Sequence, residues 1–239
     1  MLIEGRNATK EALRTDTTVE KIMIAKGQVD KTIDMIVASA RSKGIRVVFV
    51  DRNVLDKTSE TGKHQGVIAY TTEFKYCDLE DILESKPDNR LILILDEIED
   101  PHNLGSIIRV AECMGVDGIV IPKIRSASVN ETVIKTSAGA TQYMKIAKVT
   151  NVNDAIRTLK DNFFNVYGLD MDGVKLGDAH LTGDLALVVG NEGSGIRNLT
   201  AKLCDGMVSI PMTGHVESLN ASVATGIALY ECFTKRAKK

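Results

Sequence analysis

Three short segments of the chain carry the side chains best suited to chemistry. They span residues 96–105, 190–195 and 210–221, and each follows an apolar run. In the first segment, Asn103 is a residue type that caps helices, and Gly105 allows a close approach of backbone. Arg109 lies six residues after Asn103, within the first two turns of the expected helix. A capped helix with a solvated arginine explains the same residues without any chemistry.

The second segment is rich in glycine, with Gly190, Gly193 and Gly195 around one acidic residue. Such glycines can cradle a phosphate, but their spacing is not that of a dinucleotide-binding loop, and no phosphate-binding lysine follows. The carboxylate of Glu192 would also repel a phosphate. The segment therefore favours a ligand with a cationic centre or with ribose hydroxyls. A tight turn between strand and helix is the alternative that needs no ligand.

The third segment leads into a long helical pattern over residues 221–237. Ser218 and Asn220 are N-cap types, so helix capping alone explains both of them. Val223, Ile227 and Tyr230 then share one face of the helix, and this face must meet the core or a partner.

The elements that position these segments alternate between strand and helix. Apolar β-type runs occupy residues 91–97, 118–122, 145–149, 165–170, 185–190 and 207–211. Helical patterns lie between most of them, at 104–115, 130–141, 152–163, 197–204 and 221–237. This alternation predicts an α/β domain with a parallel sheet covered on both faces. Since ligands bind at the carboxyl ends of the strands in such sheets, we expect the three segments to meet at one edge.

Residues 1–75 are predicted to form a separate, small α/β domain. Helical patterns at 5–14 and 31–44 accompany strand patterns at 19–26, 45–50 and 66–72, while 51–65 is expected to be irregular. Residues 76–90 combine a short helical pattern with a turn signal, so we interpret them as a linker. The second domain then covers residues 91–239.

Composition excludes several classes of protein. No apolar run approaches the roughly 18 residues that span a membrane, and the N-terminus lacks a signal-peptide core, so we expect a cytoplasmic protein. The four cysteines and four histidines are scattered, which predicts neither a metal site nor a disulfide framework. Residues 1–75 hold 13 Lys and Arg against 10 Asp and Glu, in a chain of net charge −2. This mild basic excess is compatible with RNA contact without requiring it.

Taken in order, the three segments resemble the three motifs of the SpoU branch of the SPOUT RNA methyltransferases. The matching residues are D-x-x-x-D-P-x-N-x-G-x-x-x-R-x-A (96–111), G-N-E-G-x-G (190–195) and I-P-M-x-G-x-V-x-S-L-N-x-S (210–222). The N-terminal part, with G-R-N-A-x-x-E-A-L (5–13) and K-H-Q-G-V-I-A (63–69), is similar to that family's L30e-like RNA-binding extension. Within the family, the chain most resembles the bacterial 23S rRNA guanosine-2′-O-methyltransferases.

The resemblance implies a fold and a cofactor that the residue pattern alone does not give. Members of this family have a trefoil knot near the C-terminus of the α/β domain, bind S-adenosyl-L-methionine in the knot loops and form homodimers through this domain. By matching positions, Gly190, Ile210 and Leu219 should contact the cofactor. The methyl acceptor would be a ribose 2′-hydroxyl of RNA, in a guanosine of 23S rRNA.

The resemblance also implies catalytic roles for five side chains. Arg109 would activate the 2′-hydroxyl; because a guanidinium is a poor base, stabilisation of the developing alkoxide is an equal alternative. Asn103 would orient Arg109 or the ribose, Glu192 would hold the arginine or the cofactor, and Ser218 and Asn220 would shape the acceptor side. Two other functions stay open, a tRNA 2′-O-methyltransferase and a non-catalytic RNA-binding protein that kept the fold.

Overall fold

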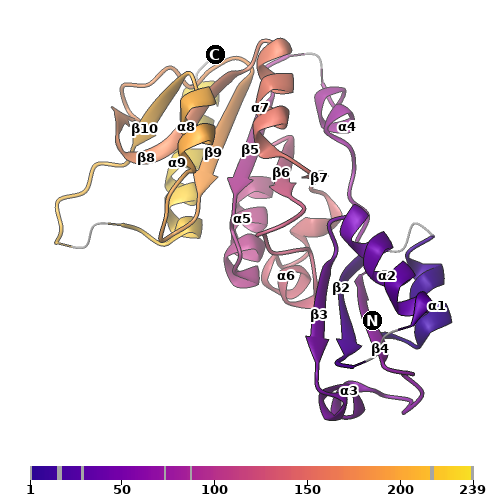
Figure 1. Cartoon of the computed structure of the whole chain (residues 1–239). Coiled ribbons are helices and arrows are strands. Elements are labelled where there is room, and N and C mark those ends of the chain that lie inside the picture. The colour runs from indigo at the N-terminus through magenta and orange to yellow at the C-terminus, as the bar shows by residue number, and fades with distance from the viewer. Residues whose placement is uncertain are drawn as a thin grey trace. The chain divides into compact units, whose positions relative to one another are not determined.

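The computed structural model describes residues 2–14, 18–27, 30–72, 74–86, 88–215 and 218–237. The chain divides into two compact units, Met1–Lys75 and Tyr76–Lys239 (Figure 1). Within the described ranges, no helix combines the length and the apolarity that a membrane crossing requires.

The first unit contains a four-stranded mixed sheet. Its strands are β1 (Leu2–Glu4), β2 (Thr18–Ala25), β3 (Arg46–Val50) and β4 (Val67–Thr72), in the order β1-β4-β2-β3. Strand β4 runs antiparallel to both neighbours, whereas β2 and β3 are parallel. Helices α1 (Arg6–Ala12) and α2 (Lys31–Ser42) have the predicted type, and the apolar face of α2 is buried in the core of this unit. The predicted α/β character of the first unit is confirmed.

Helix α3 (Arg52–Thr58) lies within residues 51–65, which the sequence predicted to be irregular. Its Leu55 is fully buried beside Met23 and Ile68. One buried residue in a helix of seven leaves no apolar period for sequence analysis to detect, which is why the prediction was wrong. The loop that follows is held by Glu4, whose carboxylate accepts hydrogen bonds from the Ser59 hydroxyl at 2.5 Å and the Glu60 N–H at 2.6 Å.

The second unit contains a six-stranded sheet in which every neighbouring pair of strands is parallel. The strands are β5 (Leu91–Asp96), β6 (Gly118–Pro122), β7 (Ile146–Val149), β8 (Asn165–Lys175), β9 (Leu185–Gly190) and β10 (Gly206–Ser209). Their order is β10-β8-β9-β5-β6-β7. The helices are α4 (Leu79–Leu83), α5 (Pro101–Cys113), α6 (Glu131–Thr136), α7 (Val152–Asp161), α8 (Asn198–Leu203) and α9 (Ala221–Ala237). The predicted parallel α/β architecture is confirmed.

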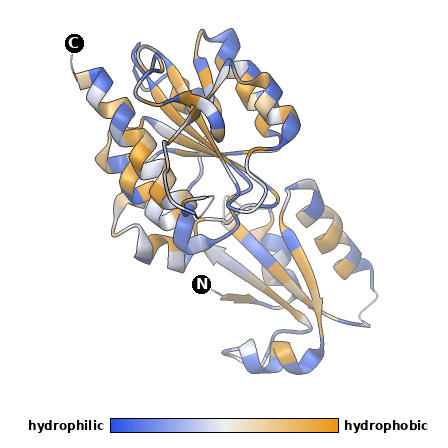
Figure 2. Cartoon of the chain, turned by 90° about the vertical axis from the view of Figure 1, so that its left-hand side faces the viewer, coloured by the Kyte–Doolittle hydropathy of each residue, from blue (hydrophilic) through white to orange (hydrophobic). Residues whose placement is uncertain are grey.

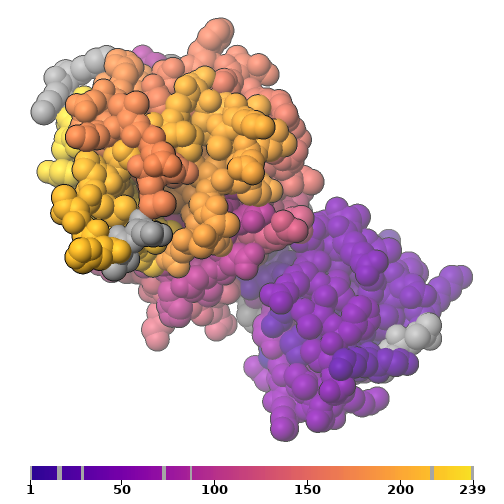
Figure 3. Space-filling model, turned by 60° about the vertical axis from the view of Figure 1, so that its left-hand side comes forward, coloured from indigo at the N-terminus to yellow at the C-terminus, as the bar shows by residue number. Residues whose placement is uncertain are grey.

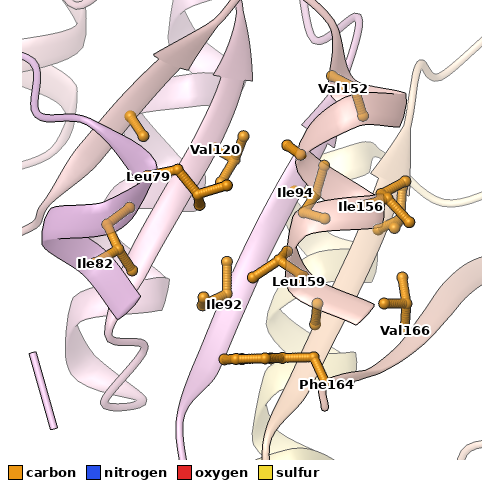
Figure 4. Close-up of a cluster of buried hydrophobic side chains, with 14 of the residues drawn as sticks. Leu79, Ile82, Ile92, Ile94, Val120, Val152, Ile156, Leu159, Phe164 and Val166 are labelled. Carbon is orange, nitrogen blue, oxygen red and sulfur yellow. The ribbon is translucent and has the colours of Figure 1, made fainter. Parts of the chain in front are cut away.

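Apolar side chains cover both faces of this sheet. Ile92 and Ile94 of β5 point to one face and pack with Ile156 and Leu159 of α7 (Figure 4). The intervening Leu91, Leu93 and Leu95 are equally buried, on the opposite face. The strands therefore read as continuous apolar segments between helices of mixed hydropathy (Figure 2), as expected for a parallel sheet buried on both sides.

Residues 76–90, which the sequence predicted to be a linker, belong to the second unit. They carry α4, whose Leu79 and Ile82 are buried in the core against the large sheet. The predicted helix 130–141 is also interrupted. Helix α6 ends at Thr136, because Ala138 and Gly139 adopt positive φ angles of 51° and 92°, and a 3-10 turn (Ala140–Gln142) follows.

Candidate functional site at the carboxyl edge of the parallel sheet

The three chemically distinctive segments meet at one edge of the large sheet. Strands β5 and β9 are neighbours, with Asp96 opposite Gly190 at their carboxyl ends, so the first two segments leave the sheet side by side. Together with β8 and the segment after β10, the glycine-rich segment encloses a cavity of about 360 Å³. The orange residues of β8 and the gold residues that follow β9 and β10 come together on the face shown in Figure 3. A cavity of this size suits a small-molecule ligand.

The glycine-rich segment is a closed turn that brings backbone close to the cavity. Asn191 and Gly195 exchange two backbone hydrogen bonds, of 3.1 and 2.9 Å. A Cβ atom at Gly190 would lie 2.2 Å from the carbonyl carbon of Gly195, so no other residue fits there. Gly195 itself has φ 66°. The tight turn and the ligand cavity are therefore the same feature, and the two interpretations of these glycines do not exclude each other.

Asn103 does not cap the helix, contrary to the sequence expectation. Helix α5 begins at Pro101, and Asp100 is its N-cap, accepting a hydrogen bond from the His102 N–H. Asn103 is consequently inside the first turn, where its side chain is free to face the other loops. Its Nδ2 donates to Oε1 of Glu192 at 2.9 Å.

Asn220 completes a polar triangle with Asn103 and Glu192. Its Nδ2 donates to Oδ1 of Asn103 at 2.9 Å and to Oε1 of Glu192 at 2.5 Å. Its Oδ1 accepts from the backbone N–H groups of Ser222 and Val223, so the predicted capping of α9 by Asn220 is confirmed. The triangle joins one residue from each of the three segments.

A buried ion pair that the sequence analysis missed fixes the first two segments to each other. Asp96 is fully buried, and its Oδ1 lies 2.6 Å from the Arg197 guanidinium. The hydrogen bond from Arg197 to Asp96 raises the pKa of Arg197. Glu97 has a φ of 67° and also lies 3.4 Å from Arg197, while its carbonyl accepts from Asn191. Pairing across two adjacent strand ends depends on sheet order, which the sequence did not reveal.

The structure places five of the eight predicted site residues in the wall of the cavity. These are Gly190, Glu192, Ile210, Ser218 and Leu219. Asn103 and Asn220 stand behind the wall, bonded to Glu192. Val216 and Glu217 of the third motif lie outside the described residues.

Arg109 is separate from this group. It lies six residues after Asn103 on α5, which turns it about 120° around the helix axis. Its side chain is exposed, and within the described part of the chain it makes no hydrogen bond or ion pair. Within one chain, Asn103 and Glu192 are therefore bonded to each other and to Asn220, and not to Arg109, which leaves the ribose and the cofactor as their expected partners.

The cavity wall suits a cationic ligand with apolar parts. Among the wall residues that the structure describes, the charged side chains are Asp170 and Glu192, and none is a lysine, arginine or histidine. Leu169, Met171, Ile210, Met212 and Leu219 supply apolar surface. Among the described residues there is no cluster of three or more His, Cys, Asp or Glu side chains that could hold a metal ion.

The fold and the cavity define an α/β protein with an acidic and apolar cavity at the carboxyl edge of a parallel sheet. Comparison with known families is consistent with this class. Residues 90–230 match the SpoU rRNA methylase family, and residues 2–77 match the family described as RNA 2′-O ribose methyltransferase substrate binding. The chain belongs to the SpoU family of RNA methyltransferases, which confirms the resemblance predicted from the three motifs.

Full-length relatives share this assignment. A protein of Staphylococcus saprophyticus, provisionally named a TrmH family tRNA/rRNA methyltransferase, is 41% identical over 99% of this chain and 96% of its own length. A Bacillus subtilis protein with the same provisional name is 40% identical over 97% and 94%. The crystal structure of the SpoU methyltransferase AviRb from Streptomyces viridochromogenes, in complex with AdoMet, has a TM-score of 0.65 at 24% identity, covering 100% of this chain and 91% of AviRb.

Proposed function

We propose that the protein transfers a methyl group from S-adenosylmethionine to the 2′-hydroxyl of a guanosine ribose in 23S rRNA. The observation that carries this proposal is the acidic cavity. Residues of the second and third family motifs line it, and the hydrogen bonds among Asn103, Glu192 and Asn220 connect it to the first motif. S-adenosylmethionine carries a net positive charge and a ribose, which are the features that the glycine-rich segment and Glu192 favour. AviRb, which shares the fold, was crystallised with this cofactor.

Some cavity residues are proposed to contact the cofactor, and others are proposed to keep the surrounding loops in position. Gly190 gives the ligand access to backbone groups that a side chain would cover, and Ile210 and Leu219 offer apolar contacts. Glu192, bonded to Asn103 and Asn220, fixes the position of Ser218 and Leu219 at the start of α9. When bound, the cofactor supplies an electron-poor methyl group, whose bond to sulfur breaks with its electron pair returning to sulfur while the 2′ oxygen gains the methyl and releases its proton.

Arg109 is proposed to stabilise the negative charge that develops on the 2′ oxygen. A permanently charged guanidinium with no partner among the described residues is free to take an RNA phosphate or the reacting oxygen. Because Arg109 does not line the cavity of its own chain, a second copy would complete the site. Helix α5 packs against α9, and a Cβ built on Gly226 of α9 would lie 3.7 Å from the neighbouring Val110, so the arginine lies beside the helix that we assign to the dimer interface.

A homodimer through α9 is supported by side chains that the second unit leaves uncovered. Val223, Ile227 and Tyr230 are 50%, 42% and 57% exposed and share one helical face. Replacing Tyr230 with glutamate should shift sedimentation from dimer to monomer, whereas the same change at Tyr143, exposed elsewhere on the second unit, should not. A wild-type monomer would contradict the proposal.

The first unit is proposed to bind the RNA substrate, since it matches a substrate-binding family and has a mild basic excess. Removing residues 1–75 should weaken RNA affinity while leaving S-adenosylmethionine affinity near that of the full chain. Circular dichroism would verify that the remaining unit folds. Unchanged RNA affinity would assign recognition to the second unit instead.

The decisive experiment combines cofactor binding with mapping of the product. Calorimetry should detect S-adenosylmethionine binding; its absence would favour a non-catalytic RNA-binding protein. Labelled methyl transfer should then be compared between 23S rRNA and tRNA, with 2′-O-methyl positions mapped on the product. Transfer to tRNA alone would support the proposed methyl transfer but replace 23S rRNA with tRNA as the substrate.

A further inference from the structure

The pairing of strand β8 with strand β10 is interrupted beside the cavity. Gly168 lies opposite Met207 of β10, but the next pair joins Val174 to Val208. Residues 169–173 are therefore looped out opposite a single peptide link of β10. Leu169, Asp170 and Met171 of this excursion line the cavity.

Tight contacts fix both ends of the excursion. A Cβ atom on Gly173 would lie 2.4 Å from the carbonyl carbon of Met207, so only glycine allows the strand to return at this point. The carbonyl of Gly173 also accepts a hydrogen bond from the Ser209 hydroxyl at 2.7 Å. At the other end, a Cβ on Gly168 would meet the Met207 side chain at 2.6 Å. The close packing at Gly168 and Gly173 therefore fixes the position of Asp170 between them.

Asp170 and Glu192 supply the negative charge of the cavity wall, but they are not equivalent. Oε1 of Glu192 accepts from Asn103, Asn220 and the backbone N–H of Ala221. Among the described residues, the Asp170 side chain accepts one long hydrogen bond, of 3.4 Å, from the Asp172 N–H. Asp170 is half-buried and accepts one long hydrogen bond, so its carboxylate keeps more capacity for a ligand than that of Glu192, whose Oε1 is engaged three times.

We propose that Asp170 is the residue that selects the positively charged cofactor over its neutral-sulfur product. This inference rests on the proposed function. Methyl transfer converts a sulfonium into an uncharged thioether, while the ammonium, the carboxylate and the adenosine stay the same. A carboxylate in the cavity wall therefore favours S-adenosylmethionine over S-adenosylhomocysteine, which has one positive charge fewer, and this difference helps the product to leave. The neighbouring wall residues Leu169, Met171 and Met212 carry no charge, so Asp170 is the charged group on this side of the described wall.

The test is calorimetric binding of both compounds to full-length wild type and to Asp170→Asn, which keeps the shape and removes the charge. We expect S-adenosylmethionine affinity to fall about tenfold, equal to about 1.4 kcal/mol, and S-adenosylhomocysteine affinity to change less than twofold. Asp172→Asn is the matched control, because Asp172 is on the same excursion but does not line the cavity; it should leave both affinities unchanged.

Two further measurements keep the outcome clear. Asp170→Glu should restore most of the preference, and the wild-type preference should shrink as salt is raised, since screening weakens a charge interaction. Equal losses for both compounds would assign Asp170 to a part that they share and overturn the inference while leaving the proposed function intact. A wild type that binds neither compound would overturn both.

Discussion

Asn103 and Glu192 are hydrogen-bonded at 2.9 Å although 89 positions separate them in the chain. The bond joins the first turn of α5 to the glycine-rich segment, and Asn220 joins both to the start of α9. Asn103, Glu192 and Asn220, which come from three separate loops, thus form one hydrogen-bonded group at the cavity wall. The family motifs are consequently linked by contact as well as by order in the sequence.

Replacing Asn220 with alanine should both destabilise the protein and weaken cofactor binding. The change removes the cap of α9, worth about 1 kcal/mol, and the hydrogen bonds that Asn220 donates to Asn103 and Glu192. We expect the free energy of unfolding to fall by about 2 kcal/mol in total. Asn130→Ala is the control, because Asn130 caps α6 by accepting from the Val133 N–H and does not line the cavity. Chemical denaturation and calorimetry would measure both effects. A loss of stability equal to that of the control, with unchanged affinity, would show that Asn220 only caps.

The centre of the sheet could be predicted from the sequence because its strands are continuous apolar runs, as in Leu91–Asp96, whereas the mixed second half of β8, after residue 170, was not predicted. The turn at Gly190 and the cap at Asn220 were also visible, since both depend on local residue type. The role of Asn103 was missed because Asp100 and Asn103 are both cap types and only the structure decides between them. The Asp96–Arg197 pair and the excursion at Asp170 depend on strand order and register, which have no local signal. The knot, which the resemblance implied, stays a prediction.

Alanine at Gly190 should abolish cofactor binding. The new Cβ would lie 2.2 Å from Gly195 and force the turn to open, which displaces the backbone that faces the cavity. Gly177→Ala offers a control, because a Cβ there would meet nothing within 4 Å and Gly177 does not line the cavity. Calorimetry with S-adenosylmethionine, alongside thermal unfolding, would separate lost binding from lost folding. Near-normal affinity of the Gly190→Ala protein would mean that the ligand does not depend on this turn.

Replacing Arg109 with alanine should abolish methyl transfer and leave cofactor affinity near wild type. Arg109 is exposed and does not line the cavity, so its removal takes away charge at the acceptor without disturbing the ligand site. Lysine at the same position should restore part of the rate if the charge stabilises the alkoxide. Arg157→Ala, which breaks an exposed pair with Asp154 on α7, serves as a control. Turnover of Arg109→Ala within a few-fold of wild type would remove this residue from the mechanism.

Lowering the pH should destabilise the loop after α3, because protonation of Glu4 weakens the hydrogen bonds that its carboxylate accepts from that loop. Hydrogen bonds from Ser59 and then Thr61 lower the pKa of Glu4 from its ordinary 4.5 to about 2. A lowered pKa in the folded state means that the carboxylate stabilises the fold fully above pH 4.5, and that this contribution is lost as the pH falls towards 2. Glu4→Gln should therefore be less stable than wild type at neutral pH, and the gap should close between pH 4.5 and 2.

A carbon-detected NMR titration of Glu4 provides the direct measurement, and amide exchange of Glu60 and Thr61 reports the loop. Both amides donate to the Glu4 carboxylate, so their protection should fall together as that group takes a proton. Glu11→Gln is a suitable control, because it changes another carboxyl of the same unit and should leave the loop unaffected. Titration of Glu4 near 4.5, or a stability gap that persists at pH 2, would show that these hydrogen bonds do not hold the loop in solution.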